Sequence, residues 1–258
     1  MKLELREKKE EQTKRFLAHV RDLITRCERQ YQPCYTAFLD EAAAARAMQV
    51  LIPDPDQFAA MLWGGHAAAQ RVVYSVYPVY EQPEPADFPI VCLTIRFPVS
   101  QHLSHRDVLG AFLSCGLERD TIGDILFGEG MAQVFVLSSV SAFLQQNIRK
   151  IGRVGVRIVD NLPFSLSVTQ EFEPISGTVA SLRADAIAAF AAKISREKAV
   201  AMIQHSYMER NHNVVSSPSE QLTEGDQFVL RGFGKFRLTS ISGVTKKGRL
   251  HILVEKYK

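Results

Sequence analysis

The clearest candidates for chemistry lie in the last third of the chain, around a predicted helix start. Ser195 is positioned to cap a helix beginning at Arg196, and a helix start leaves backbone N–H groups unpaired. Lys198 lies in the first turn, and Arg183 and Arg210 lie on flanking elements. Cations around a helix N-terminus favour phosphate. The spacing therefore predicts a surface that binds the backbone and shape of structured RNA.

Motifs of known catalytic chemistry are missing from the other two-thirds. His105-Arg106-Asp107 mimics the kinase catalytic trio, but Phe112 stands where a metal-binding Asn is needed. Capping and packing at a helix start is the favoured interpretation of this trio. The sequence contains no Walker loop, no Gly-x-Ser-x-Gly and no His-Glu-x-x-His. We expect a protein that is not an enzyme and has no cofactor. An unrecognised RNA-modifying enzyme stays open as the alternative.

Composition bounds the class of protein. A chain of 258 residues with 46% hydrophobic and 23% charged residues can bury hydrophobic cores, and its length suggests about two domains. No apolar run reaches the roughly 18 residues that a membrane span needs, and the N-terminus has no apolar signal region. A cytoplasmic protein without membrane contact is expected. The four cysteines have no zinc-type spacing, which predicts buried reduced thiols and no metal site.

The net charge of +3 hides an asymmetry along the chain. From Ile175 onward there are 13 Lys and Arg against 7 Asp and Glu, which leaves an acidic excess in the part before it. A basic excess concentrated in one segment favours a polyanionic partner. Solvated surface lysines explain the charge alone equally well.

The pattern of the first 81 residues predicts an N-terminal α+β domain. Apolar residues at helical spacing predict a helix over about 7–30, and Asp40 is placed to cap a second helix that stops before Pro53. Two strand-like runs flank Gly64-Gly65. The proline-rich stretch 82–89 has no periodicity and predicts a linker.

The second predicted domain, residues 87–170, has the element order βαββαβ of a ferredoxin-like fold. RRMs share this topology, but the predicted third strand "AQVFVLS" carries Phe135 as its one aromatic residue. Base stacking by this domain is therefore disfavoured. Arg149, Lys150 and Arg153 are better candidates for backbone contact, although a solvated helix terminus explains them about as well.

Residues 176–258 resemble the S-four-type RNA-binding domain, or alpha-L motif. Its pattern of Arg-Leu-Asp, Ser-Arg, a strand ending in Asn, and Gly-Asp is matched by Arg183-Ala184-Asp185, Ser195-Arg196, Asn211 and Gly225-Asp226. The strand before Asn211 departs from the pattern. The stretch "RGFGKFRL" (231–238) resembles an RRM stacking strand, but Lys235 replaces the aromatic residue. It predicts the end of one strand, a glycine-flanked bend and an added hairpin.

Nearly the whole chain resembles the YlmH proteins of Gram-positive bacteria. The similarity lies in the "HRDVLG" stretch (105–110), in Gly116 with Arg119, in "GDI" (123–125), and in Gly64-Gly65 followed by Arg71. The resemblance implies a non-catalytic protein that binds structured RNA, rRNA or tRNA, on the large ribosomal subunit during quality control of stalled peptidyl-tRNA complexes. A cell-division-linked adaptor is a second implied role.

Together, these patterns predict the fold class, the partners and the residues that bind RNA. The fold class is α+β: a helical N-terminal domain with a small sheet, a ferredoxin-like middle domain and an alpha-L domain with an added β-hairpin. The partners are structured RNA and the large subunit, bound by a monomer. The predicted main RNA-binding residues are Arg183, Lys193, Ser195, Arg196, Lys198, Arg210, Asn211, Lys235, Arg237, Lys246, Lys247 and Arg249. The predicted secondary set is His105, Arg106, Arg149, Lys150 and Arg153.

Overall fold

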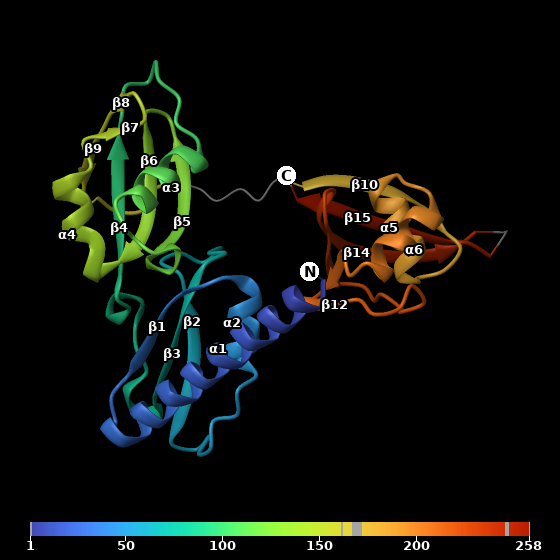
Figure 1. Ribbon diagram of the computed structural model, residues 1–258, viewed down its shortest axis with the longest axis horizontal. Coiled ribbons are helices and arrows are strands. Elements are labelled where there is room, and N and C mark those ends of the chain that lie inside the picture. Colours follow the sequence, from blue (N-terminus) through green and yellow to red (C-terminus); the bar gives the residue numbers. More distant parts are fainter. Residues whose placement is uncertain (1, 161, 167–171, 246–247, 258) are drawn as a thin grey trace. The chain divides into compact units, whose positions relative to one another are not determined.

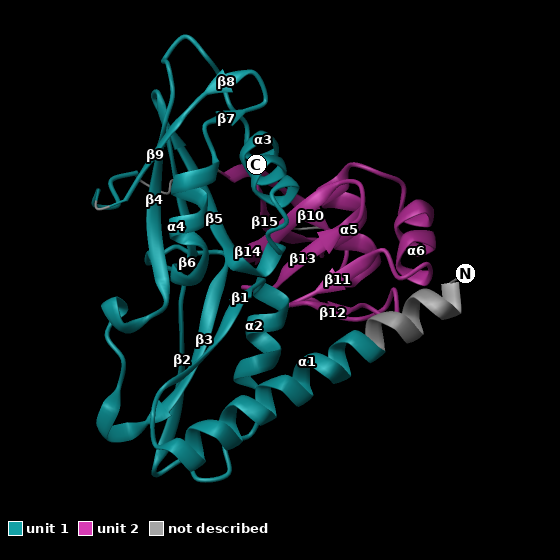
Figure 2. Ribbon diagram, turned by 60° about the vertical axis from the view of Figure 1, so that its left-hand side comes forward, with its two compact units in different colours: residues 1–168 teal, residues 169–258 magenta. Residues whose placement is uncertain are grey.

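The computed structural model describes residues 2–160, 162–166, 172–245 and 248–257, with side chains from residue 11 onward (Figure 1). It is an α+β protein, as predicted, and divides into two compact units, residues 1–168 and 169–258 (Figure 2). The three-domain division over 1–81, 87–170 and 176–258 stays a prediction. Within the described ranges, none of the helices is both long and apolar enough to span a membrane.

The first unit begins with a three-stranded antiparallel sheet covered by two helices. Its elements are α1 (Lys2–Gln30), β1 (Cys34–Leu39), α2 (Glu41–Met48), β2 (Phe58–Trp63) and β3 (Val72–Pro78), and the strand order is β1-β3-β2. The helix α1 forms because Val20, Leu23, Ile24 and Cys27 recur at helical spacing, and all four are buried. Asp40 caps α2, as predicted, by accepting a hydrogen bond from the Ala43 N–H.

The strand β1 was not predicted. Its central inward residue is Thr36, which is polar and breaks the apolar alternation that identifies a strand. The structure satisfies this hydroxyl across the sheet, since Thr36 Oγ1 accepts a 3.0 Å hydrogen bond from the Tyr74 N–H. A buried threonine therefore serves as part of the strand pairing.

A four-stranded antiparallel sheet follows, with the element order βαββαβ. Its main elements are β4 (Ile90–Arg96), α3 (His105–Ser114), β5 (Ile122–Gly128), β6 (Met131–Leu137), α4 (Ser138–Asn147) and β9 (Arg157–Val159), and the strand order is β5-β6-β4-β9. The 3₁₀ turns are η1 (Val79–Glu81), η2 (Pro85–Asp87) and η3 (Arg119–Thr121). Phe88 and Phe135 share a buried cluster with Phe38 and Val73 of the first sheet, so the two sheets of this unit are packed together.

The predicted end of the second helix in this sheet was wrong. The prediction had Ser139 as cap and a helix to about Ile151, whereas the cap position is Leu137, two residues earlier, and α4 ends at Asn147. A small hairpin, β7 (Lys150–Ile151) and β8 (Val154–Gly155), replaces the last turn, and Gly152 at φ 57° makes its bend. Arg149, Lys150 and Arg153 therefore lie before and within a hairpin instead of on a helix.

The second unit is a six-stranded sheet with two short helices. Its elements are β10 (Phe172–Val179), α5 (Ala184–Ala192), α6 (Arg196–Gln204), β11 (Met208–Arg210), β12 (Asn213–Val214), β13 (Gln227–Leu230), β14 (Gly234–Val244) and β15 (Leu250–Tyr257). The strand order is β10-β15-β14-β13-β11-β12, antiparallel throughout. The hairpin β14–β15, predicted as an addition, lies in the middle of this sheet because β10, which was not predicted, pairs along its outer side.

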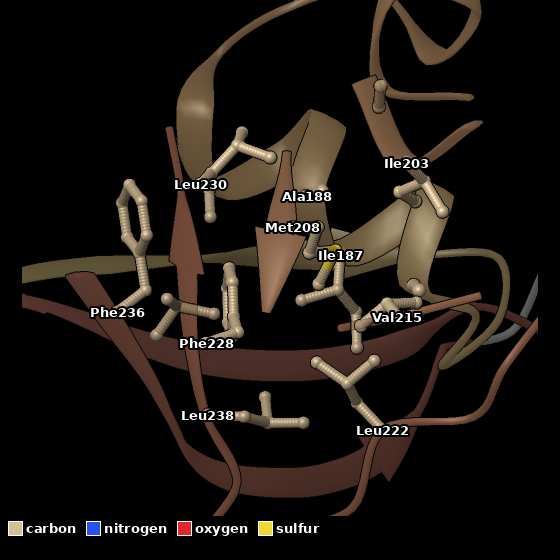
Figure 3. Close-up of a cluster of buried hydrophobic side chains, with 14 of the residues drawn as sticks. Ile187, Ala188, Ile203, Met208, Val215, Leu222, Phe228, Leu230, Phe236 and Leu238 are labelled. Atoms are coloured by element: carbon tan, nitrogen blue, oxygen red, sulfur yellow. The ribbon is translucent and has the colours of Figure 1, made fainter. Parts of the chain in front are cut away.

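Every second side chain along β13 and β14 points into the core of this unit (Figure 3). Phe228, Leu230, Phe236 and Leu238 are all buried beside residues of α5 and α6. The rings of Phe228 and Phe236, directly opposite in the strand register, stack with centroids 5.2 Å apart. Because side chains alternate across a strand, Lys235 and Arg237 extend from the opposite face of the sheet.

Candidate nucleic-acid interface

A buried carboxylate organises two of the predicted RNA-binding arginines. Asp185, in the first turn of α5, accepts hydrogen bonds from Arg183 Nε and Nη2, both at 3.1 Å. It also accepts from Arg196 Nε at 3.1 Å and from Arg196 Nη2 at 3.3 Å. The Asp185 side chain is 3% exposed, whereas those of Arg183 and Arg196 are 35% and 53% exposed. We call these three residues the Asp185 cluster.

The geometry of the Asp185 cluster leaves both guanidinium groups with hydrogen-bonding capacity toward solvent. An arginine has five N–H donors, and each of these two uses a pair of them on the carboxylate. Burial by itself would raise the pKa of Asp185, but the hydrogen bonds and charges of Arg183 and Arg196 outweigh it and hold that pKa below its usual value. The carboxylate stays ionised and fixes two outward-facing cations.

The start of α6 has the predicted cap. Ser195 Oγ accepts a 3.2 Å hydrogen bond from the Lys198 N–H. The N–H groups of Arg196 and Glu197, in the same first turn, have no acceptor within the helix. The Lys198 Nζ lies 5.4 Å from the ring centroid of Phe233, in the bend between β13 and β14. In the same bend, the guanidinium of Arg231 lies 5.2 Å from the ring centroid of Tyr207. The bend after β13 therefore adds Arg231, which was not predicted, to the cations near α6.

Arg210 and Asn211 serve a second buried carboxylate. Arg210 Nε lies 2.7 Å from Asp226 Oδ2, and Asn211 Nδ2 donates to Asp226 Oδ1 at 2.7 Å. The backbone N–H of Thr223 completes the set at 2.7 Å, and we call these four residues the Asp226 cluster. Asn211 has φ 45°, a conformation that Asn tolerates better than most residues. Both predicted RNA-binding residues thus hold a turn of the sheet in place.

One segment joins the two clusters. The backbone N–H groups of Ala184 and Asp185 donate to the carbonyls of Glu220 and Pro218, at 2.7 and 3.1 Å. On the other side, Arg210 Nη1 donates to the Gln221 carbonyl at 2.9 Å. The Asp185 and Asp226 clusters therefore lie on either side of residues 218–221 and are built as one unit.

The remaining predicted residues are divided among different places. Lys193 is exposed and ends α5 in a left-handed conformation, at φ 53°. Lys235 lies over the ring of Tyr257 and, with Arg237, projects from the sheet face opposite Phe236. Arg249 is held by Thr178, to whose carbonyl its Nη2 donates at 2.7 Å. The predicted residues Lys246 and Lys247 lie outside the described residues.

The predicted secondary set is also divided. Arg106, Arg149 and Lys150 line one groove of about 740 Å³ between α3 and the β7–β8 hairpin. Arg153 is exposed in the bend of that hairpin. The pKa of His105 is lowered by burial and by the charge of Arg119, while Asp124 acts in the opposite direction. His105 is therefore electrostatically coupled to the residues between the two sheets of the first unit.

Those residues form a polar joint around Asp124. Its carboxylate accepts from the Gln70 N–H at 2.7 Å and the Arg71 N–H at 3.0 Å, and lies 3.2 Å from His66 Nε2. Arg71 in turn donates to the carbonyls of Ile122 and Phe38, at 2.9 and 3.0 Å. Burial lowers the pKa of Arg71. The joint ties a loop of the first sheet to β5 of the second.

Other chemistry is not assembled in the described part of the chain. There, no group of three or more His, Cys, Asp or Glu residues is placed to hold a metal ion. The cysteines carry free thiols: Cys27 and Cys34 are buried, Cys92 is half-buried and Cys115 is exposed. The prediction of buried thiols was therefore wrong for Cys115, which lies just beyond the last turn of α3.

Comparison with known proteins matches residues 83–164 to a family described as "Putative RNA-binding domain in YlmH". The chain is 32% identical over 198 residues to a Bacillus subtilis (strain 168) protein named "Ribosome-associated protein quality control protein P2". That match covers 76% of this chain and 77% of the relative. The chain belongs to the YlmH family. A solved structure of the cell division protein ylmH from Streptococcus pneumoniae is 27% identical, covers 58% of this chain and 92% of its own, and has a TM-score of 0.50.

Several residues that carried the YlmH resemblance have structural roles. Arg71, Arg119 and Asp124 belong to or adjoin the polar joint, and Gly123 lies under the ring of Phe38. A side chain at Gly65 would overlap the Phe135 ring, and one at Gly64 would overlap Ala69 and the Arg71 carbonyl, which explains the double glycine. These YlmH motifs therefore hold the two sheets of the first unit together.

Sequence reasoning missed the organisers of the interface. Asp185 and Asp226 lie within the matched motifs, but the sequence did not predict them as functional residues. Their signal was present: an acidic residue two positions after Arg183, and another after Gly225, in a basic segment. An isolated carboxylate among cations predicts an ion pair, but the sequence alone does not specify which cations it binds.

Proposed function

We propose that this YlmH-family protein is a non-catalytic RNA-binding protein whose S-four-type second unit binds structured RNA on the large ribosomal subunit. The observation that carries the proposal is the Asp185 cluster. A single buried carboxylate holds two partly exposed guanidinium groups, each with N–H donors left for phosphate. Guanidinium forks fixed in this way are pre-organised for the backbone of folded RNA.

The start of α6 extends the proposed surface. Its unpaired N–H groups and Lys198 add donors and charge in the same helical turn as Arg196. Arg231 lies in the bend that also holds Phe233, the ring beneath Lys198. The Asp226 cluster is joined to this surface through residues 218–221, and its Arg210 and Asn211 are paired with Asp226. Arg183, Arg196, Lys198 and Lys193 are therefore proposed to contact RNA, and Arg210 and Asn211 to position them.

The relatives support a ribosomal setting. The Bacillus subtilis relative is named for ribosome-associated protein quality control, and residues 83–164 match a family described as RNA-binding. We therefore propose rRNA of the large subunit, or the tRNA of a stalled peptidyl-tRNA complex, as the RNA that is bound. A cytoplasmic location and action without catalysis are parts of the same proposal. The ferredoxin-like middle fold, a monomeric state and contacts by Lys235, Arg237 and Arg249 belong to the same proposal.

The Asp185→Asn variant tests this proposal. If Asp185 only neutralises Arg183 and Arg196, removing its charge makes the surface more basic and RNA binding tighter. If it orients them, binding weakens, because each re-immobilised side chain costs about 0.5–1.5 kcal/mol. We expect a loss of about tenfold in affinity for a structured rRNA fragment at fixed salt, since about 1.4 kcal/mol is a factor of ten. Unchanged or tighter binding would contradict the pre-organised surface.

Two controls accompany that measurement. Arg183→Lys with Arg196→Lys keeps the charge and loses the planar fork, so it should weaken binding as Asp185→Asn does. Arg26→Glu changes an exposed cation on α1 in the first unit and should leave affinity unchanged. Because Asp185 is buried, its replacement also costs about 1–3 kcal/mol of stability, so folding is checked at the assay temperature.

A cell-division role is a second candidate, since the Streptococcus pneumoniae structure is named a cell division protein. The two candidates separate on what the protein binds. A ribosomal protein sediments with large subunits in a lysate, and treatment with RNase releases it. An adaptor for division sediments with a protein complex that resists RNase. An RNA-modifying enzyme would instead leave a chemical change in the rRNA, which mass spectrometry of rRNA from a deletion strain would detect.

A further inference from the structure

A groove in the first unit brings a basic residue of α3 beside a basic pair at the start of β7. The helix α3 packs beside β7, and both views of the ribbon place α3 next to the β7–β8 hairpin (Figures 1 and 2). Arg106 from α3, Arg149 after α4 and Lys150 from β7 line the resulting groove of about 740 Å³. Arg106 is more than forty residues from the adjacent pair Arg149-Lys150 in sequence, and the fold brings them to one groove.

The acidic residue of this lining is already occupied. Asp107 accepts hydrogen bonds from the Ser104 N–H at 2.9 Å and the Ser104 hydroxyl at 2.6 Å, as part of the capping box of α3. Arg149 is held in place, because its Nη1 donates to the Gln145 carbonyl at 2.7 Å. The described lining therefore presents a net positive charge with one of its cations in a fixed position.

The net positive charge of the groove, and the lack of a large exposed apolar side chain in its described lining, favour a nucleic-acid backbone over a protein segment. Among the described residues that line it, Ile148 has the one large apolar side chain, and it is 3% exposed. Protein partners are usually anchored by apolar or aromatic side chains entering such pockets. Gly110 and Gly152 leave the groove open, since a Cβ added at either would meet nothing within 4 Å. A chain recognised by charge, without apolar anchors, fits these walls.

We propose that this groove binds the sugar–phosphate backbone of RNA, as a second contact separate from the Asp185 cluster. Arg106, Arg149 and Lys150 contact phosphates, and binding depends little on sequence because no base edge is read. His105 and Arg153, the latter in the bend of the hairpin, are not among the described residues that line the groove. A second contact on the same RNA raises the overall affinity by making the next binding step intramolecular.

Gly110→Glu tests the groove without removing any cation. The new side chain has open space, and replacing glycine within a helix favours folding, so the variant should unfold at or above the wild-type temperature. The probe is a labelled RNA hairpin with single-stranded flanks, titrated with full-length protein. We expect affinity to fall about fivefold or more, and the slope of log affinity against log salt to shrink by about two. Gly110→Ala, which adds no charge, is the matched control and should bind like wild type.

The variant Lys193→Glu with Lys198→Glu separates this inference from the proposed function. If Gly110→Glu binds RNA like wild type while the double variant does not, the groove proposal is wrong and the Asp185 surface stands. If Gly110→Glu weakens binding and the double variant does not, the groove stands and the proposed function of the second unit fails. A poly-glutamate peptide is titrated in parallel. Binding of that peptide, lost in Gly110→Glu while RNA affinity is unchanged, would assign the groove to an acidic protein segment and overturn the proposal.

Discussion

At the scale of single residues, two buried aspartates determine what the basic side chains of the second unit do. Asp185 pairs with two partly exposed arginines, each of which keeps N–H donors that face solvent. Asp226 pairs instead with Arg210 and Asn211, at a turn of the sheet. The sequence predicted Arg183 and Arg196 as cations of the surface. It did not separate them from Arg210, because all three are arginines in a basic segment and only the fold decides which carboxylate each one meets.

The Asp226 cluster predicts how stability depends on pH. Burial alone would raise the pKa of Asp226, but bonds from Thr223, Asn211 and Arg210 outweigh it and lower that pKa. The unfolded chain then binds the proton more tightly, so the stabilisation is complete above the ordinary pKa of about 3.9 and is lost as pH falls through the lowered folded value.

We therefore expect Asp226→Asn to be less stable than wild type near neutral pH. Because the variant carboxamide does not titrate, its stability should fall less than that of wild type between about pH 5 and pH 2. Urea unfolding at a series of pH values measures both effects. Parallel curves for the two proteins below pH 5 would show that Asp226 does not contribute to acid sensitivity. Glu173→Gln, on the exposed side of β10, is the control.

At the scale of elements, the sequence predicted the caps and turns that depend on residues close together in the chain. The caps at Asp40 and Ser195, the turn at 211–213 and the bend after β13 were all predicted, because each depends on residue types within a few positions. The strands β1 and β10 were not predicted. Their residues become strands through pairing with β3 and β15, which are distant in sequence, and Thr36 and Gly177 interrupt their apolar patterns.

The helix α3 gives a prediction at this scale. Gly110 lies in its middle with a right-handed backbone and open space around it, so glycine has no packing role there. We expect Gly110→Ala to stabilise the protein by about 0.5–1 kcal/mol, because alanine loses less conformational entropy in a helix. Differential scanning calorimetry measures the change. A lower unfolding temperature would mean that Gly110 is needed for a contact absent from this structure.

At the scale of the molecule, each compact unit has its own hydrophobic core. The core of the second unit, which includes Phe228 and Phe236, is built from residues after 168, and the clusters of the first unit are built from residues before it. The sequence predicted the βαββαβ order of the middle sheet. The shared cluster of Phe38, Phe88 and Phe135 was not predicted, because a proline-rich stretch between two patterned regions is typical of a linker.

Separate cores predict separate responses to a core mutation. Phe228→Ala should cost about 3–5 kcal/mol, the usual cost of removing a buried phenylalanine. We expect the loss in hydrogen-exchange protection to be confined to residues 172–257, with amides of β4 and β6 exchanging as in wild type. Equal loss of protection in both units would show that they unfold as one cooperative body.

The proposed function requires that the surface around α6 bring the protein to the large ribosomal subunit. It is tested most directly by sedimenting full-length protein with purified large subunits of Bacillus subtilis, the source of the quality-control relative. Wild type should co-sediment, and Lys193→Glu with Lys198→Glu, which leaves the Asp185 and Asp226 clusters intact, should stay at the top of the gradient. If wild type also stays at the top, or if both proteins co-sediment equally, the proposed binding of the large subunit through the surface around α6 is wrong.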